Sequence, residues 1–349
     1  MTRVAINGFG RIGRAAFKTI VGPDTWGRAR RSPRITPTDY QIVAINDLTD
    51  TETLAYLLKY DTVYGIFPVD CGYDEKHLIV DKQKFPVFAE KDPANLPWDK
   101  LQVDVVLECT GVFEEYEKAK SHLTAGAKKV IISAPGKGKN GKTLVFGTET
   151  INHQPPTTYQ YPVSNASCTT NCIAPVIQVL HSNFGLEKSL MTTVHAYTAT
   201  QNLVDGPSKD LRRGRAAAEN IVPSSTGAAI ATTEVIPELA NVFDGVALRV
   251  PLACGSISDI TAVLKRNVTV SEVNRVFTEA TKNPLFRDIL EVSEEPLVST
   301  DIIGSPASAI VDLEFTRVVG GNLVKVLAWY DNEWAYANRL VELAQVIGK

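Results

Sequence analysis

A glycine-rich turn near the N-terminus limits the possible folds of this chain more than any other segment. Residues 3–7 form a short apolar run, residues 8–13 follow as Gly-Phe-Gly-Arg-Ile-Gly, and a helical pattern covers residues 14–20. Between a strand and a helix, such glycines permit a tight turn and close approach of the backbone to a pyrophosphate. The helix N-terminus then presents free N–H groups to the phosphates. The segment predicts a dinucleotide cradle at Gly8, Gly10 and Gly13; a turn without a ligand is the alternative.

The second apolar strand also favours a dinucleotide site. Residues 41–46 form this strand pattern, and Asp47 follows directly. A carboxylate at that position would accept hydrogen bonds from an adenosine ribose and repel a 2′-phosphate, which favours NAD over NADP. Asp47 lies 34 residues after Gly13, whereas the usual spacing is about 20. The extra length falls in residues 22–40, whose prolines break helices and strands, so we expect a surface insertion. Its arginines are expected on a solvated face: Arg28, Arg30, Arg31 and Arg34.

Further alternation of strand and helix patterns predicts the class of the first half. Residues 103–107 have a strand pattern, residues 114–125 a helix pattern and residues 128–133 another strand pattern. Apolar strands that alternate with helices are typical of a doubly wound parallel sheet, so we predict an α/β, Rossmann-type unit. Ligands of such sheets bind beyond the carboxyl ends of the strands, where Thr110 and Ser133 fall.

Composition and charge exclude several classes of protein. The 349 residues, 44% of them hydrophobic, suit a soluble globular protein of two domains. A net charge of −3 offers no general attraction to nucleic acid, and no apolar run approaches the roughly 20 residues of a membrane span. The N-terminus has a strand pattern rather than a signal peptide, and the five cysteines have neither disulfide-framework nor zinc-site spacing. We therefore expect a cytoplasmic protein without a metal.

A cysteine among hydroxyl and amide side chains is the strongest chemical signal. Residues 164–172 have the sequence Ser-Asn-Ala-Ser-Cys-Thr-Thr-Asn-Cys, and an apolar helical pattern follows. Cys168 is therefore expected at a helix N-terminus, where unpaired N–H groups and the helix dipole favour the reactive thiolate. Cys172, one turn later among apolar residues, fits an ordinary buried cysteine. Cys168 is predicted to be a nucleophile with a lowered thiol pKa.

A nucleophilic cysteine needs a base, and an anionic substrate needs positive charge nearby. His195 is the candidate base, because it lies near the end of a strand pattern over residues 191–198. The other histidines lie in unremarkable polar or helical settings: His77, His122, His153 and His181. Residues 205–220 form a long Arg-rich segment, residues 224–227 are Ser-Ser-Thr-Gly before a helix, and Arg249 ends a strand pattern. Together they predict an anion site near a reactive thiol.

Taken in order along the chain, these motifs resemble the phosphorylating glyceraldehyde-3-phosphate dehydrogenase family from end to end. The resemblance is carried by His195 and by residues 5–14, 125–130, 164–172, 223–227, 249–251 and 329–333. It implies a glycolytic and gluconeogenic oxidoreductase that converts glyceraldehyde 3-phosphate, inorganic phosphate and NAD to 1,3-bisphosphoglycerate and NADH through a cysteine thioester. It also implies a homotetramer whose long loop packs across a subunit interface.

The resemblance implies roles for individual residues. Cys168 would attack the aldehyde, with His195 as base and oxyanion donor. The substrate phosphate and the attacking phosphate would be bound by Ser167, Thr169, Thr198, Arg212, Thr226, Gly227 and Arg249. NAD would be bound by Gly8, Gly10, Arg11, Ile12, Gly13, Asp47, Lys91, Thr110, Ser133, Asn332 and Tyr336. The chain departs from the family pattern in a loop after Pro207 that is one residue short and in Leu252, where a threonine is usual.

The resemblance also implies a division into domains. Residues 1–167 are expected to form the NAD-binding domain, residues 168–332 an α+β catalytic domain with a mixed or antiparallel sheet, and residues 333–349 a helix that returns to the first domain. Three other functions stay open. An erythrose-4-phosphate dehydrogenase would share the thiol and NAD chemistry, an RNA- or partner-binding protein would use the arginines of the insertion, and a cysteine hydrolase would have no use for the dinucleotide motif.

Overall fold

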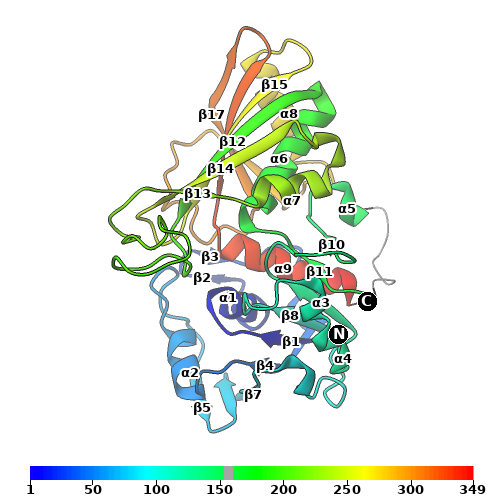
Figure 1. Ribbon diagram of the computed structural model, residues 1–349, viewed down its shortest axis with the longest axis vertical. Helices are drawn as coiled ribbons and strands as arrows, with labels where there is room; N and C mark the ends of the chain where they lie inside the picture. Colours follow the sequence, from blue (N-terminus) through cyan, green and yellow to red (C-terminus); the bar gives the residue numbers. More distant parts are fainter. Residues whose placement is uncertain (153–159, 349) are drawn as a thin grey trace. The chain divides into compact units, whose positions relative to one another are not determined.

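The computed structural model describes residues 1–152 and 160–348, with all of their side chains except that of Asn152. His153 and Lys349 therefore lie outside the described residues. Contacts within the chain group it into two compact units (Figure 1). The first comprises Met1–Leu144, His153–Ala166 and Tyr336–Lys349, and the second comprises Val145–Asn152 and Ser167–Ala335. The expected domain boundary at residue 167 stays a prediction.

The first unit is built on a nine-stranded sheet in the order β10-β11-β9-β8-β1-β4-β7-β6-β5. Its strands are β1 (Thr2–Asn7), β4 (Tyr40–Asn46), β5 (Cys71–Asp74), β6 (His77–Val80), β7 (Gln83–Phe88), β8 (Val105–Glu108), β9 (Lys129–Ile132), β10 (Lys142–Thr143) and β11 (Val163–Ser164). Neighbours are parallel from β10 to β7, and only β6 and β5 add antiparallel pairs. The strands β1 and β8 are buried because helices cover parallel sheets on both faces. The predicted Rossmann-type sheet is confirmed.

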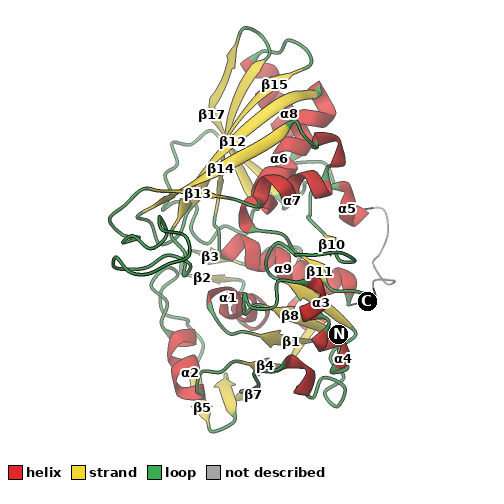
Figure 2. Cartoon of the chain, viewed as in Figure 1, coloured by secondary structure: helices red, strands yellow, loops and turns green. Residues whose placement is uncertain are grey.

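Short helices connect these strands (Figure 2). They are α1 (Arg11–Val21), η1 (Pro37–Asp39), α2 (Thr51–Lys59), η2 (Pro93–Asn95), α3 (Tyr116–Ala119) and α4 (Ser121–Thr124). Two further helices do not belong to this unit alone: α5 (Glu149–Asn152) is part of the second unit, and α9 (Trp334–Ile347) begins in the second unit and ends in the first. The single helix predicted over residues 114–125 is wrong. The chain forms α3 and α4 instead, because the N–H of Lys120 bonds to the carbonyl oxygens of both Tyr116 and Lys118 and tightens the turn between them.

The insertion at residues 22–40 packs onto the first unit, and the prediction of a solvated arginine face is wrong in part. The insertion contains the hairpin of β2 (Thr25–Trp26) and β3 (Ala29–Arg30). Arg28 and Arg30 are exposed, as expected. Nε of Arg31, however, donates a hydrogen bond to the carbonyl oxygen of Thr19 at 2.7 Å, and Arg34 forms an ion pair with a glutamate of α9 at 3.0 Å. A guanidinium at the C-terminus of α1 satisfies carbonyls that the helix leaves unpaired.

The second unit has a seven-stranded mixed sheet in the order β13-β14-β12-β15-β18-β17-β16. Its strands are β12 (Leu186–Ala196), β13 (Val222–Ser225), β14 (Phe243–Val250), β15 (Ser256–Leu264), β16 (Leu290–Ser293), β17 (Ala309–Val319) and β18 (Leu323–Tyr330), and its longer helices are α6 (Cys168–Phe184), α7 (Ala228–Val235) and α8 (Val270–Ala280), with η3 (Pro237–Leu239) after α7. The pairs β12–β14 and β16–β17 are parallel, and the others are antiparallel. The expected mixed sheet is confirmed.

The two faces of this second sheet differ in exposure. Along β15 buried and half-buried side chains alternate, and β18 shows the same alternation after its exposed first residue. Such alternation is typical of a sheet with one face on the core. The helices α6, α7 and α8 lie beside the sheet (Figure 1). The buried face therefore carries the side chains that meet α6.

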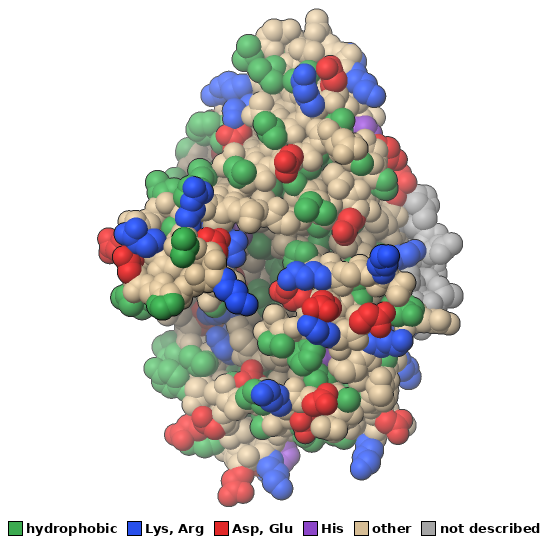
Figure 3. Space-filling model, in the orientation of Figure 1, with side chains coloured by type: hydrophobic (Ala, Val, Ile, Leu, Met, Phe, Trp, Pro, Cys, Tyr) green, Lys and Arg blue, Asp and Glu red, His purple; other side chains and the backbone are tan. Residues whose placement is uncertain are grey.

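Two properties of the described residues concern membranes and metals. Within residues 1–152 and 160–348, no helix is long and apolar enough to span a membrane. The same residues hold no group of three or more His, Cys, Asp or Glu side chains arranged to bind a metal ion. On the face drawn in Figure 3, basic and acidic side chains are interspersed rather than gathered by sign.

Candidate functional site

Cys168 is the first residue of α6, as the sequence predicts. Ser167 caps the helix, because its Oγ accepts a hydrogen bond from the N–H of Thr170 at 3.0 Å. Cys168 is partly exposed, whereas Cys172 is fully buried. Sγ of Cys168 lies 3.3 Å from Nε2 of His195, so the thiol and the imidazole are within hydrogen-bond distance. The structure thus brings the predicted nucleophile and base together.

Strand pairing places His195 directly beside Arg249. His195 on β12 and Arg249 on β14 are partners in the parallel register of these strands. Nδ1 of His195 lies 2.7 Å from the carbonyl oxygen of Ala196 and 2.5 Å from Nη1 of Arg249, which also donates to that carbonyl at 3.1 Å. A buried imidazole with a backbone partner on Nδ1 has its Nε2 directed at the thiol.

The electrostatics of this pair differ from the expectation of a lowered thiol pKa. Burial raises the pKa of the Cys168 thiol, although the positive charge of Arg249 and hydrogen bonds with Thr169 act in the opposite direction. Burial, with a further contribution from Arg249, lowers the pKa of His195 to about 3. The helix N-terminus therefore does not outweigh desolvation. Both shifts favour the uncharged forms of the thiol and of the imidazole.

Tyr330 is a residue of this site that sequence reasoning missed. Its hydroxyl lies 2.9 Å from Oγ1 of Thr169 and 2.7 Å from Oγ1 of Thr193, and its ring meets the His195 ring edge-on with centroids 5.9 Å apart. Tyr330 is 1% exposed. The strand pattern before residues 331–333 was the available signal, but periodicity alone does not indicate which buried tyrosine meets a histidine. Tyr330 ties the start of α6 to β12.

The predicted phosphate-binding residues cluster around helix starts and strand ends. Oγ1 of Thr226 accepts a hydrogen bond from the N–H of Ala228, and Gly227 is the N-cap of α7. Thr198 follows β12, and its Oγ1 lies 2.9 Å from that of Thr200. Leu252, the residue that departs from the family pattern, has its carbonyl oxygen bonded to the N–H of Tyr197.

In the long loop, the predicted Arg212 and its neighbour Arg213 have different surroundings. Nη2 of Arg213 donates to the carbonyl oxygen of Ser225 at 3.4 Å. Burial lowers the pKa of the Arg249 guanidinium, and the charge of Arg213 adds a smaller effect in the same direction. The side chain of Arg212 is exposed. Arg213 also forms an ion pair with Asp210 at 3.4 Å, and the carboxylate of Asp210 accepts from the backbone N–H groups of both arginines.

A cavity of about 420 Å³ lies at the carboxyl ends of β1, β4, β7 and β8 in the first unit. Five of the predicted cofactor residues line it: Gly8, Gly10, Asp47, Lys91 and Thr110. Oδ2 of Asp47 accepts a hydrogen bond from the N–H of Phe9 at 2.7 Å, which fixes the glycine turn to the end of β4. Gly8 has a φ of +90°, and a Cβ there would lie 2.6 Å from the backbone nitrogen of Thr110. Both the positive φ and the close approach to Thr110 therefore require glycine at position 8.

The start of α1 is suited to bind a pyrophosphate. Arg11, Ile12 and Gly13 form its first turn, which has no acidic residue and no side-chain cap. A Cβ at Gly10 would have no neighbour within 4 Å, so the backbone there is open to a ligand. Unpaired N–H groups at a helix start bind phosphate oxygens. The side chain of Arg11 is ion-paired to Asp61 at 3.0 Å.

The remaining predicted cofactor residues have other surroundings. Ser133 follows β9 and its N–H donates to the carbonyl oxygen of Glu108. Asn332 belongs to the second unit, where its Oδ1 accepts hydrogen bonds from the N–H of Gly255 and the hydroxyl of Ser256. Tyr336 belongs to the first unit, and its hydroxyl donates to the carbonyl oxygen of Ala166 at 2.9 Å. Hydrogen bonds therefore orient the side chains of Asn332 and Tyr336.

His122, expected in an unremarkable setting, is fully buried behind the cavity. Its Nε2 lies 3.0 Å from Oε2 of Glu108, and Nε1 of Trp98 donates to its Nδ1 at 3.0 Å. The expectation is wrong because the polar pattern of residues 120–124 does not indicate that the His122 side chain faces β8. Only the fold brings Trp98 and Glu108 to this ring.

Comparison with known proteins agrees with both units. The model of the glyceraldehyde 3-phosphate dehydrogenase NAD binding domain matches residues 2–116, and that of the C-terminal domain matches residues 167–332. A glyceraldehyde-3-phosphate dehydrogenase of Thermotoga maritima is 51% identical over 349 residues, which cover 100% of both chains. One from Mycobacterium leprae is 50% identical over 349 residues, or 99% of this chain and 98% of the other. One from Streptomyces coelicolor is 47% identical over 346 residues, again 99% and 98%.

Proposed function

The chain belongs to the glyceraldehyde-3-phosphate dehydrogenase family, and we propose that it oxidises glyceraldehyde 3-phosphate with NAD and phosphate to 1,3-bisphosphoglycerate. The observation that carries this proposal is the distance of 3.3 Å between Sγ of Cys168 and Nε2 of His195 at the start of a helix. The relatives named above are all glyceraldehyde-3-phosphate dehydrogenases, and they favour this activity over that of an erythrose-4-phosphate dehydrogenase.

The residues of the first unit fit NAD. The open backbone at Gly10 and the uncapped start of α1 suit a pyrophosphate, and the carboxylate of Asp47 suits a ribose without a 2′-phosphate. Lys91 and Thr110 border the same cavity, and Arg11, Ile12 and Ser133 lie at the neighbouring helix start and strand end. When bound, NAD supplies the acceptor for the hydrogen that leaves the aldehyde carbon with its electron pair.

Cys168 and His195 carry the first half of the reaction. Nε2 of His195 takes the proton of the Cys168 thiol, and the sulfur attacks the aldehyde carbon to form a hemithioacetal. The protonated imidazole gives that proton to the oxygen as it becomes negative, which leaves the hemithioacetal hydroxyl and a neutral imidazole. As the carbon is oxidised, Nε2 removes the hydroxyl proton and a thioester to Cys168 remains. Because the pKa of His195 is lowered to about 3, its imidazole is a neutral acceptor before this step.

Inorganic phosphate completes the reaction. A phosphate oxygen attacks the thioester carbon, the carbon–sulfur bond breaks, and Cys168 leaves as a thiolate that regains its proton from solvent or from His195. Arg249 and Thr198 are proposed to hold the phosphate of the substrate, and Ser167, Thr169, Thr226 and Gly227 to line the site of the attacking phosphate. Arg213 joins them because its charge lies close to that of Arg249, while Arg212 is kept as the sequence-based candidate. Asn332 and Tyr336 are proposed to orient the nicotinamide.

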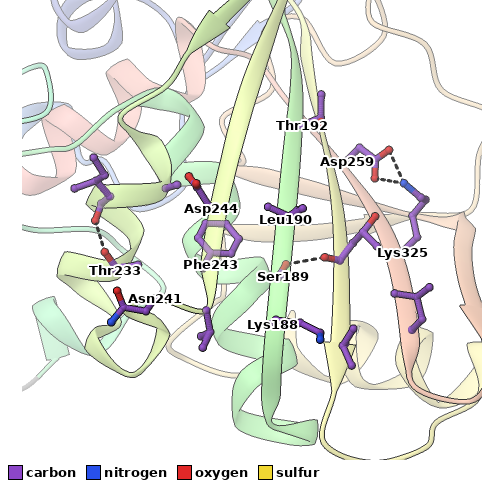
Figure 4. Close-up of a pocket in the computed structure, with 16 residues that line it drawn as sticks. Lys188, Ser189, Leu190, Thr192, Thr233, Asn241, Phe243, Asp244, Asp259 and Lys325 are labelled. Carbon is purple, nitrogen blue, oxygen red and sulfur yellow. Dashed lines mark hydrogen bonds and ion pairs between the residues drawn. The ribbon is translucent and has the colours of Figure 1, made fainter.

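The open face of the second sheet is proposed to bind a second copy of this chain. A groove of about 990 Å³ crosses β12, β14, β15 and β18 beside α7 (Figure 4). Leu190 and Ile230, at its lining, are 66% and 67% exposed, and Lys325 and Asp259 form an ion pair of 2.5 Å at one side of it. A face with exposed leucine and isoleucine around a balanced ion pair suits a self-complementary contact. This supports an oligomer, and a homotetramer is the state we propose.

A cytoplasmic location is proposed from the thiols. All five cysteines are free, including the partly exposed Cys71, Cys109 and Cys168. Free thiols persist in reducing compartments. With basic and acidic side chains interspersed on the face in Figure 3, nucleic acid is not proposed as a partner.

An NADH assay on the parent protein and Cys168→Ser tests the function. We expect NADH only when glyceraldehyde 3-phosphate, NAD and phosphate are all present, with turnover of erythrose 4-phosphate much slower. The serine variant should bind NAD but form no measurable NADH, because a serine hydroxyl is hardly ionised near neutral pH. NADH formation at the parent rate by Cys168→Ser, or preference for the four-carbon sugar, would overturn the proposal.

A further inference from the structure

A buried chain of polar side chains extends inward from the lining of the nucleotide cavity, to which Asn7 and Asn46 belong. It consists of Asn7, Asn46, Glu108 and His122, which are between 0% and 4% exposed, together with the indole of Trp98. The indole N–H can only donate, so Nδ1 of His122 accepts from it at 3.0 Å. Nε2 of His122 then carries the hydrogen and donates it to Oε2 of Glu108 at 3.0 Å. The direction of the first two hydrogen bonds is thereby fixed.

Glu108 connects these hydrogen bonds to one rim of the cavity. Its Oε2 also accepts from Nδ2 of Asn7 at 2.5 Å. Its Oε1 accepts from the N–H of Thr110 at 2.8 Å and from the Thr110 hydroxyl. Oγ1 of Thr110 in turn accepts from the N–H of Val112 at 3.0 Å. The carboxylate therefore accepts from four donors, two of which belong to Thr110, and both Thr110 and Val112 border the cavity.

Asn7 and Asn46 connect the same hydrogen bonds to the opposite rim of the cavity. Nδ2 of Asn46 donates to Oδ1 of Asn7 at 2.7 Å and to the carbonyl oxygen of Glu90 at 2.9 Å, and its Oδ1 accepts from the N–H of Glu90 at 2.9 Å. Glu90 precedes Lys91, and both border the cavity. A single buried network thus joins the ends of β1, β4 and β8 and the segment that follows β7.

We propose that Glu108 and His122 are positioning residues for NAD: they do not touch the nucleotide, but hold Thr110 and, through Asn7 and Asn46, the backbone of Glu90 where the nucleotide meets them. The inference rests on the proposed NAD-dependent function. Gly8 connects the network to the phosphate turn, because a Cβ there would lie 2.6 Å from the nitrogen of Thr110. A shift of Thr110 therefore disturbs the glycine turn as well as the rim.

Because every hydrogen-bond partner of the Glu108 carboxylate is a donor, Glu108→Gln is the variant that tests this role. In Glu108→Gln an amide replaces the carboxylate, and its NH₂ group must face either the Thr110 N–H or the Asn7 and His122 donors. Either orientation sets donor against donor in a buried place. We expect the dissociation constant of NAD to rise about tenfold or more, while kcat at saturating NAD stays within about twofold of the parent value. Calorimetric titration of NAD into the full-length protein gives the first value.

A pair of substitutions at His122 makes the test independent of Glu108. His122→Gln keeps one donor for Glu108 and one acceptor for Trp98, and we expect it to bind NAD as the parent does. His122→Leu removes both groups and should weaken NAD binding about as much as Glu108→Gln. Tyr40→Phe is the matched control, because it removes a buried hydroxyl bond of the same unit, 3.2 Å to the carbonyl oxygen of Val341, away from the cavity.

The outcomes separate this inference from the proposed function. A parent protein that does not bind NAD overturns the function itself. A parent that binds NAD, with a folded Glu108→Gln or His122→Leu whose dissociation constant is within twofold of it, overturns the positioning role alone. If Glu108→Gln does not fold, His122→Leu decides. Weaker NAD binding by Tyr40→Phe of the same size also overturns the role, because loss of stability would then suffice.

Discussion

Nη1 of Arg249 lies 2.5 Å from Nδ1 of His195, its partner on the neighbouring parallel strand. One ring nitrogen cannot accept from Arg249 and also donate to the carbonyl oxygen of Ala196, which lies 2.7 Å away. Only the tautomer that donates to Ala196 leaves a lone pair on Nε2, and this tautomer is the base for Cys168. In this tautomer Nη1 of Arg249 donates to the carbonyl oxygen of Ala196 at 3.1 Å rather than to the ring nitrogen.

Arg249→Ala is expected to make Cys168 less reactive toward a neutral alkylating reagent. The positive charge of Arg249 lowers the pKa of the thiol, against the stronger opposing effect of burial, so its removal raises that pKa further and leaves less thiolate at neutral pH. Iodoacetamide labelling followed by mass spectrometry gives the rate at Cys168. Arg215→Ala, which removes an exposed arginine paired with Asp205 at 3.0 Å, is the control and should react as the parent. Equal rates in Arg249→Ala and the parent would contradict this electrostatic role.

Stability should fall in acid through His195. The unfolded chain protonates this residue near its ordinary pKa of 6.5, whereas the folded protein does so only near pH 3. Between these values the unfolded state binds the additional proton, so the free energy of unfolding decreases as the pH falls from 6.5 toward 3. The slope from this group alone is about 1.4 kcal/mol per pH unit.

Urea unfolding of the parent and of His195→Gln over this range isolates that slope. Carboxylates that titrate in the same window contribute equally to both proteins and cancel in the difference. The variant should lose less stability than the parent as the pH falls. Parallel curves would mean that the imidazole is already protonated in the folded protein at these pH values.

Tyr330→Phe should cost stability without removing the nucleophile or the base. The substitution leaves the hydroxyls of Thr169 and Thr193 without their common partner, and an unsatisfied buried hydroxyl costs about 1–3 kcal/mol. Chemical denaturation measures the loss. Alkylation of Cys168 should change little, because the thiol and the imidazole remain and the phenyl ring still packs against His195. A variant as stable as the parent would show that the two threonines find other partners.

The regular parts of the fold were predictable because local patterns determine them. The glycine turn follows from Gly8, Gly10 and Gly13, and the strand–helix alternation gives the parallel sheet. Arg31 was not predictable: nothing in its sequence neighbourhood indicates that it binds the end of α1, because the hairpin of β2 and β3 directs it there. His122 was hidden for the same reason, since Trp98 and Glu108 reach it only in the folded chain.

Within the candidate site, the functional residues could be predicted from the sequence, but the orientation and burial of their side chains could not. Cys168, His195 and Arg249 are distinctive in the sequence, and strand register together with the start of α6 bring them into contact. The thiol pKa depends on how much water reaches Sγ, and a helix N-terminus does not reveal that burial. The two arginines at residues 212 and 213 are equivalent in the sequence, and only the contacts that Arg213 makes in the folded loop distinguish them.

Arg213 is therefore expected to matter more than Arg212 for binding phosphate. Arg213 lies close enough to Arg249 for the two charges to interact, and its Nη2 bonds to the carbonyl of Ser225, next to Thr226. A charged hydrogen bond to phosphate lost in Arg213→Ala would raise the KM for inorganic phosphate about tenfold or more. Arg212→Ala, a change to an exposed side chain of the same loop, is the matched control and should leave the KM within about twofold. Steady-state NADH formation against phosphate concentration gives both values. The reverse order of effects would mean that the loop turns at Asp210 in the opposite sense when phosphate is bound, so that Arg212 enters the site.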